Sequence, residues 1–282
     1  MFEFQQQAQE QGWNKANKLE GRATAHGLIG VQVDANAAVM VELNCETDFV
    51  ARNKQFLSLL QTVTDLNISA AKLDSNSDDS SLSMKSLEKD YLDKIKQADG
   101  KDLSDLVALN IGQIGENLSL KKAEHFAIGT QSDQKLHVIG FTHPSGDVKT
   151  LSYGKYGVLM ALERTQSAIQ PKELNIEVLG QQLCQHVVGM NPESVGDLSN
   201  PKSWPQPQKK EKPVQEETEE DNPDNPYGDY DESVTEEDFG TSEKEMIHQP
   251  FLFDTEVRVR DILLDAGLNI KGFVRYEVGQ EK

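Results

Sequence analysis

The spacing of apolar and polar residues along the chain predicts two successive units in which strands precede helices. Residues 38–43 place Val39, Val41 and Leu43 on one face of a strand and Met40 and Glu42 on the other. Residues 28–33 precede them across a polar turn at 34–36, which is typical of a β-hairpin. From residue 48 to about residue 66 the apolar positions recur every three or four residues, which favours a helix packed along one face. The first unit therefore begins with a hairpin followed by a helix.

The remainder of the first unit mixes helices with one more strand. After the Ser- and Asp-rich residues 74–83, the composition predicts a helix up to residue 98. An amphipathic helix follows over 103–114 and ends at Gly115, because glycine suits the residue after a helix. Residues 118–127 alternate and indicate a strand.

A second unit of similar shape begins at residue 135. Strands are expected at 135–142 and 157–163, with a turn at 144–147, and a helix at 173–188. Near the carboxyl terminus, residues 257–266 are typical of a helix and 272–278 of a strand that completes the second sheet.

These patterns predict an α+β fold of two similar subdomains, each a small antiparallel sheet packed with helices, plus a disordered acidic linker. The expected division is a helical lead-in, core subdomain one, core subdomain two, the linker, and a carboxy-terminal helix and strand that complete subdomain two: residues 1–21, 22–134, 135–198, 199–248 and 249–282.

Charge is concentrated in one part of the chain. Residues 211–245 hold fifteen acidic and two basic residues, a net charge of −13 out of −19 for the whole chain. This segment has several prolines nearby and almost no aliphatic residues, so it cannot bury enough apolar surface to fold. We expect it to act as a solvated tether, with a docking strip for a basic partner as the alternative.

Composition also excludes several classes of function. A chain this acidic is a poor candidate for direct nucleic-acid binding, since phosphate contacts need Lys and Arg. The apolar runs are too short to span a membrane. Two cysteines fit neither a disulfide framework nor a metal site, and no phosphate-binding loop occurs. We therefore expect no cofactor, no metal and no enzymatic activity.

The polar run between the first hairpin and its helix is the most informative segment of the chain. Residues 44–48 stand at a strand-to-helix junction, where Thr47 or Asp48 can cap the first free N–H groups of the helix. Phe49 follows at once, at a loop tip or in the first helical turn. Spacing alone favours a helix cap and an ordinary core residue, although an aromatic presented there can also enter a pocket of another protein.

The nonapeptide Glu42-Leu43-Asn44-Cys45-Glu46-Thr47-Asp48-Phe49-Val50 closely resembles the diagnostic motif of translation elongation factor Ts, the guanine-nucleotide exchange factor for elongation factor Tu. The resemblance continues in family order through residues 111–117, 249–251 and 272–279, and it covers most of the chain. It implies a heterodimer with elongation factor Tu, GDP release by perturbation of the magnesium and phosphate site of that partner, and a role in translation elongation.

The resemblance also implies which residues contact the partner. The matching Asp-Phe pair enters the G domain of elongation factor Tu, so Phe49 would be a wedge between helices and Asp48 would hydrogen-bond or repel nearby groups. Ile114 and Gly115 match positions against the same surface, with the end of a packed helix as the alternative interpretation. The residues that would shape the loop holding the wedge are Asn44, Cys45, Glu46, Thr47 and Val50. His143 falls near a family histidine in the hairpin of the second subdomain and is a further candidate contact, although its surroundings match bacterial members poorly.

Two departures from the family qualify these expectations. The amino-terminal three-helix domain of relatives has no counterpart here, so its contacts with the G domain are at risk. Where bacterial relatives carry a coiled-coil hairpin, the chain instead resembles mitochondrial members. We expect a mitochondrial matrix protein from that resemblance, although residues 2–18 lack the arginines of a transit peptide.

Two other functions stay open at this point. A chaperone-like partner would bind elongation factor Tu without efficient exchange, which the shortened amino terminus makes plausible. An enzyme using Cys45 with a histidine such as His26 is disfavoured, because the acidic residues that follow Cys45 oppose a thiolate.

Overall fold

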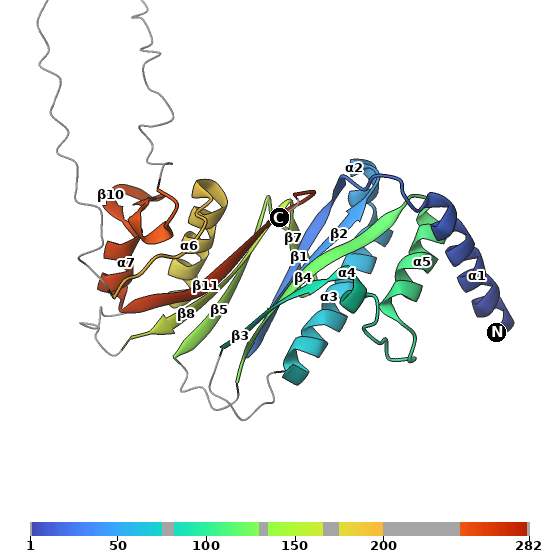
Figure 1. Cartoon of the computed structure of the whole chain (residues 1–282), viewed down its shortest axis with the longest axis horizontal. Coiled ribbons are helices and arrows are strands. Elements are labelled where there is room, and N and C mark those ends of the chain that lie inside the picture. Colours follow the sequence, from blue (N-terminus) through green and yellow to red (C-terminus); the bar gives the residue numbers. More distant parts are fainter. Residues whose placement is uncertain (1, 75–81, 130–134, 166–174, 200–242, 281–282) are drawn as a thin grey trace, which may run out of the picture.

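The computed structural model describes residues 2–74, 82–129, 135–165, 175–199 and 243–280, and the side chains of these residues from 9 onward except at 74. Two antiparallel sheets lie face to face, and helices cover the outer side of each (Figure 1). The first sheet has the strand order β3-β4-β2-β1-β7-β6 and the second has β11-β8-β5. The observed class is α+β, as expected from the sequence.

The first sheet is built on the long hairpin of β1 (His26–Asp34) and β2 (Ala37–Cys45), which stay in register from Asp34↔Ala37 to His26↔Cys45. The other strands of this sheet are β3 (Leu82–Glu88), β4 (Leu118–Ile128), β6 (Gly146–Val148) and β7 (Leu151–Gly154). The second sheet consists of β5 (Leu136–His143), β8 (Tyr156–Arg164) and β11 (Leu268–Glu277). A small third sheet pairs β9 (Pro250–Phe251) with β10 (Asp254–Arg258).

The helices follow the same order along the chain. Those of the first half are α1 (Phe2–Leu19), α2 (Asp48–Ala51), α3 (Lys54–Asp74), α4 (Lys89–Leu92) and α5 (Leu103–Ile114). Those of the second half are α6 (Ile176–Met190), the 3-10 helix η3 (Met246–His248) and α7 (Val259–Ala266).

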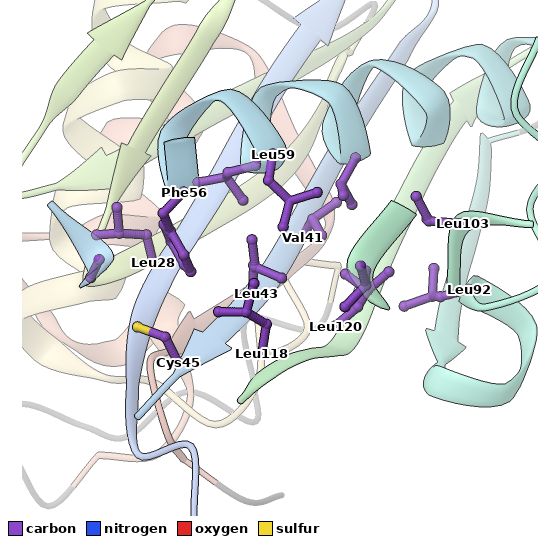
Figure 2. Close-up of a cluster of buried hydrophobic side chains, with 14 of the residues drawn as sticks. Leu28, Val41, Leu43, Cys45, Phe56, Leu59, Leu92, Leu103, Leu118 and Leu120 are labelled. Carbon is purple, nitrogen blue, oxygen red and sulfur yellow. The ribbon is translucent and has the colours of Figure 1, made fainter. Parts of the chain in front are cut away.

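Three larger apolar clusters hold these layers together, and a small fourth cluster lies between β2 and α3. The clusters form because each buried strand has one apolar face toward each neighbouring layer. Phe56 and Leu59 of α3 lie in one cluster with Leu43 of β2 on the outer face of the first sheet (Figure 2). Between the sheets, Met40 packs with side chains that include Leu159 of β8. The third cluster joins the second sheet to α6, η3 and α7. Strand β2 is buried at every residue, as expected for a strand covered on both faces.

The helix expected over 48–66 divides into α2 and α3. Arg52 ends α2, and the Asn53 side chain then accepts a hydrogen bond from the Gln55 N–H at 2.9 Å, which caps α3. The break leaves α2 as a separate four-residue helix between the sheet and α3.

The helix expected up to residue 98 is wrong over most of its length. Residues 82–88 form strand β3, which pairs with β4 from Leu82↔Ile128 to Glu88↔Lys122. Its many polar residues resemble a surface helix, but they suit an edge strand with one solvated face. Only the four residues of α4 are helical in this part.

The second unit is less self-contained than its strand and helix pattern indicates. Strand β7 pairs with β1, so residues 146–154 extend the first sheet before the chain returns to the second sheet in β8. Strand β11 pairs with β8 along its length and completes the second sheet, as expected.

The expected linker falls mainly outside the described residues. Its last residues are an exception, because Met246 and Ile247 are fully buried in the second core. Gln249, which follows η3, is also buried and pairs with His186 at 2.9 Å. The folded chain therefore resumes before residue 249, where apolar side chains again become available for burial.

Candidate functional site at the open end of the first hairpin

Helix α2 presents Phe49 to solvent at the end of the first sheet. The Phe49 side chain is 89% exposed, the largest exposure of any large apolar residue among those the structure describes. Its neighbours Val50 and Ala51 instead pack against the first core. The core position that spacing alone favoured for Phe49 is therefore wrong, because the short helix turns this side chain toward solvent.

Two connections that lie close in space hold the loop in place. The Thr47 N–H donates to Glu116 Oε2 at 3.0 Å, and the Thr47 hydroxyl donates to Glu116 Oε1 at 2.8 Å. The Thr47 hydroxyl also caps α2 by accepting from the Val50 N–H at 3.5 Å. In return, Glu46 accepts a bond of 2.7 Å from the Asn117 N–H. These bonds join the start of α2 to the connection between α5 and β4.

The end of α5 is shaped by Gly115 and supported by α1. Gly115 adopts a left-handed conformation with φ 91° and ends the helix, as the sequence predicted. The Lys15 ammonium of α1 donates to the Gly112 carbonyl at 3.1 Å, next to this end. Ile114 is half-buried and packs against the first core. The structure thus places Ile114 and Gly115 beside the Glu116 clamp.

Asp48 is held between two cations. Lys155 donates to Asp48 Oδ1 at 3.1 Å, and Arg52 pairs with Oδ2 at 2.6 Å. The hydrogen bond from Lys155 is the main cause that lowers the pKa of Asp48 below its ordinary value. In the free protein Asp48 is therefore an ionised carboxylate whose charge is balanced by Lys155 and Arg52.

Buried polar residues support the loop from below. Asn44 is 1% exposed and donates to the Thr24 carbonyl and to Glu42, both at 3.1 Å. The Cys45 thiol donates to the Thr47 carbonyl at 3.1 Å. Asn44 thus acts inside the fold rather than at the exposed surface.

Cys45 is placed as a core residue. Its side chain is buried among leucines (Figure 2), and burial followed by the charge of Glu116 raises the pKa of its thiol to about 11. His26 does lie opposite Cys45 in the hairpin register, but a thiol that stays protonated at neutral pH is a weak nucleophile. The raised pKa of the Cys45 thiol thus argues against the Cys45–His26 hypothesis.

His143 lies near this site through the backbone. It is the last residue of β5 and is exposed, and its carbonyl accepts from the Lys155 N–H at 3.0 Å. The structure thus brings Asp48, Phe49, Thr47, Val50, Ile114, Gly115 and His143 to one end of the molecule, with Asn44 beneath them.

Sequence reasoning missed two residues that hold the site. Glu116 stands inside a motif quoted above, where a carboxylate after a helix-ending glycine could have suggested a clamp. Lys155 gave no local signal, because its partner Asp48 lies 107 residues away. Within the described part of the chain, no group of His, Cys, Asp or Glu is arranged to hold a metal ion. None of the helices in that part is long and apolar enough to cross a membrane.

Comparison with known proteins agrees with the motifs that line this site. The family model described as Elongation factor TS matches residues 46–280, which is most of the chain. The chain belongs to the elongation factor Ts family. Its place in that family makes it a translation elongation factor, a protein of protein biosynthesis.

Elongation factors Ts named as mitochondrial resemble the chain over nearly its whole length. The Aedes aegypti protein is 34% identical, with 99% of this chain and 77% of that protein covered. The Xenopus laevis protein is 35% identical, with 98% and 75% covered. The Homo sapiens protein is 34% identical, with 97% and 72% covered. The chain is thus similar to mitochondrial members of the family in particular.

Proposed function

We propose that this member of the elongation factor Ts family binds elongation factor Tu·GDP and promotes GDP release by inserting Phe49 beside the magnesium and phosphate site of its partner. The observation that carries the proposal is the 89% exposure of Phe49 on a short helix whose start is clamped by Glu116. A large apolar side chain that is fixed yet unburied is suited to fill a pocket in a partner.

Holding the loop before binding makes the wedge more effective. Thr47 and Asp48 are already tied to Glu116 and Lys155 in the free protein, so little loop freedom is lost on association. Burying a phenylalanine contributes about 1.5–3 kcal/mol. Since 1.4 kcal/mol corresponds to a factor of ten in an equilibrium constant, insertion of Phe49 would weaken GDP binding by roughly one to two orders of magnitude.

The mechanism is allosteric competition and needs no covalent chemistry. By linkage, the factor by which this protein lowers the affinity of elongation factor Tu for GDP equals the factor by which GDP lowers the affinity of elongation factor Tu for this protein. A nucleotide-free heterodimer is therefore the tightest complex, and GTP binding dissolves it. The names of the relatives support a mitochondrial location, and the matrix is the compartment in which we propose that the complex works.

The test measures the release of fluorescent GDP from mitochondrial elongation factor Tu. We expect the unsubstituted protein, called the parent below, to accelerate GDP release. The acceleration by Phe49→Ala should be about tenfold smaller, because the variant loses the free energy of burying one phenylalanine. Tyr91→Ala is the matched control, because Tyr91 is an aromatic of the same half that is 56% exposed on α4. It should behave as the parent does.

Two outcomes would reject the proposal in different ways. If the parent forms a complex without accelerating release, the chain is the chaperone-like partner considered above. If the parent accelerates release and Phe49→Ala accelerates it equally, exchange occurs through another surface.

A further inference from the structure

Lys155 occupies the point where the chain passes from the first sheet to the second. It is the residue between β7 and β8, and its ammonium donates to the Gly27 carbonyl at 3.0 Å and to Asp48 at 3.1 Å. Its backbone N–H donates to the His143 carbonyl at 3.0 Å, and its own carbonyl accepts from the Val278 N–H at 3.0 Å. One residue thus ties α2 to the ends of β1, β5 and β11.

Close backbone contacts fix where the Lys155 side chain begins and what it reaches. A side chain at Gly154 would meet the His143 backbone nitrogen at 2.8 Å, so the corner before Lys155 lies tightly on β5. A side chain at Gly27 would meet the Leu43 carbonyl oxygen at 2.3 Å, so the backbone of β1 lies close to β2 here. Both ends of the Lys155–Gly27 bond are therefore held by backbone that cannot move far.

Arg52, the other cation that pairs with Asp48, cannot tie α2 to the strand ends. Arg52 lies one turn further along the same short segment, and its side chain is 80% exposed. An ion pair between neighbours of one helical turn moves with that turn. Lys155 instead belongs to the second half of the fold, and its side chain is only 36% exposed.

We propose that Lys155 is a positioning residue that holds α2, and with it the direction of Phe49, against the strand ends of both sheets. The inference rests on the proposed function, since it assigns Lys155 the task of aiming the wedge. It also gives the second sheet a part in exchange, because Lys155 is the bridge between that sheet and α2.

The first arm of the test measures GDP release against the concentration of the exchange factor. Lys155→Met keeps the length of the side chain and removes its charge, and Lys155→Arg keeps the charge. We expect Lys155→Met to lower the saturating release rate about tenfold, comparable with the loss of one charge-assisted hydrogen bond. Lys155→Arg should recover most of that rate. Lys244→Met is the control, because Lys244 also forms an ion pair, with Glu193, but is far from α2 in the second half.

The second arm needs no partner protein. The Arg52 and Asn53 N–H groups donate to the carbonyls of Phe49 and Val50, so their hydrogen exchange reports whether α2 is held. We expect faster exchange at these two amides in Lys155→Met. The thermal midpoint should shift by less than about 4 °C, since a partly exposed ion pair contributes little to global stability.

The two arms separate this inference from the proposed function. If the parent fails to accelerate GDP release, the proposed function is lost, and unchanged amide exchange in Lys155→Met would overturn the placement of α2 as well. If the parent accelerates GDP release and Lys155→Met reaches the same saturating release rate, the inference about Lys155 is overturned and the proposed function stands. A rate loss that Lys155→Arg does not rescue, accompanied by a fall in thermal midpoint like that of a folding defect, would also overturn it.

Discussion

Glu116 offers the sharpest test of how the loop is held, because both of its carboxylate oxygens bond the same residue. The Thr47 N–H and hydroxyl donate to Oε2 and Oε1 at 3.0 and 2.8 Å. Glu116→Ala removes both bonds and leaves the Thr47 N–H to water. Glu116→Gln can still accept from the N–H and donate to the hydroxyl, but the charge is gone.

The structure sets the size of the two effects. Hydrogen bonds to a charged group contribute about 1.5–3 kcal/mol each, and solvent screening at the half-buried position of Glu116 places the sum of the two at or just below twice the lower value. We expect Glu116→Ala to cost about 2–3 kcal/mol of local stability. Glu116→Gln should cost about 1 kcal/mol, because charge-assisted bonds are roughly twice as strong as neutral ones.

Hydrogen exchange at the Thr47 amide and GDP release together measure this cost. At 1.4 kcal/mol per decade, the Thr47 amide should exchange about 30- to 100-fold faster in Glu116→Ala, and about fivefold faster in Glu116→Gln. The acceleration of GDP release should fall in the same order. Glu193→Ala removes an acid whose side chain is 65% exposed in a surface ion pair, and it should change neither quantity.

Two results would refute the reasoning on Glu116. Unchanged exchange of the Thr47 amide in Glu116→Ala would show that the packing of Val50 and Ala51 and the Lys155–Asp48 bond hold the loop without Glu116. A loosened loop with parental GDP release would show that a fixed loop is not needed for the wedge.

Two further predictions concern residues behind the loop. Gly115→Ala should destabilise the protein by about 1–2 kcal/mol in urea unfolding, because φ of 91° strains any side chain, and a value near zero would contradict the left-handed helix end. Burial raises the pKa of Cys45 from 9.0 to about 11, so the stability gained from its neutral form is complete below pH 9 and is lost as the pH rises toward 11. Between pH 9 and 11, the free energy of unfolding of Cys45→Ala should therefore fall by about 2 kcal/mol less than that of the unsubstituted protein. Equal falls in the two proteins would show that the thiol does not titrate in this range.

Local periodicity predicted the strands and helices with strong apolar patterns, because such a pattern depends only on neighbouring residues. The hairpin of β1 and β2, helix α5 with its end at Gly115, and the strands β4, β8 and β11 all lie within a few residues of the expected positions. The polar run before Phe49 also indicated a junction with a helix cap, and Thr47 provides that cap. These features are local, so the sequence alone determines them.

Pairings over long separations needed the folded chain. Strand β3 looks helical in sequence, and only its partner β4 makes it a strand. Strand β7 belongs by sequence to the second unit but pairs with β1 of the first.

The site depended on tertiary structure in the same way. The sequence named Asp48 and Phe49, yet spacing could not tell a core phenylalanine from an exposed one, because a four-residue helix is too short to show a face. Glu116 and Lys155 lie 69 and 107 residues from the loop residues they hold. The sequence thus determined which residue types stand at the junction, and the tertiary structure decided that Phe49 faces outward and what keeps it there, since hydrogen bonds and ion pairs form between groups that are close only after folding.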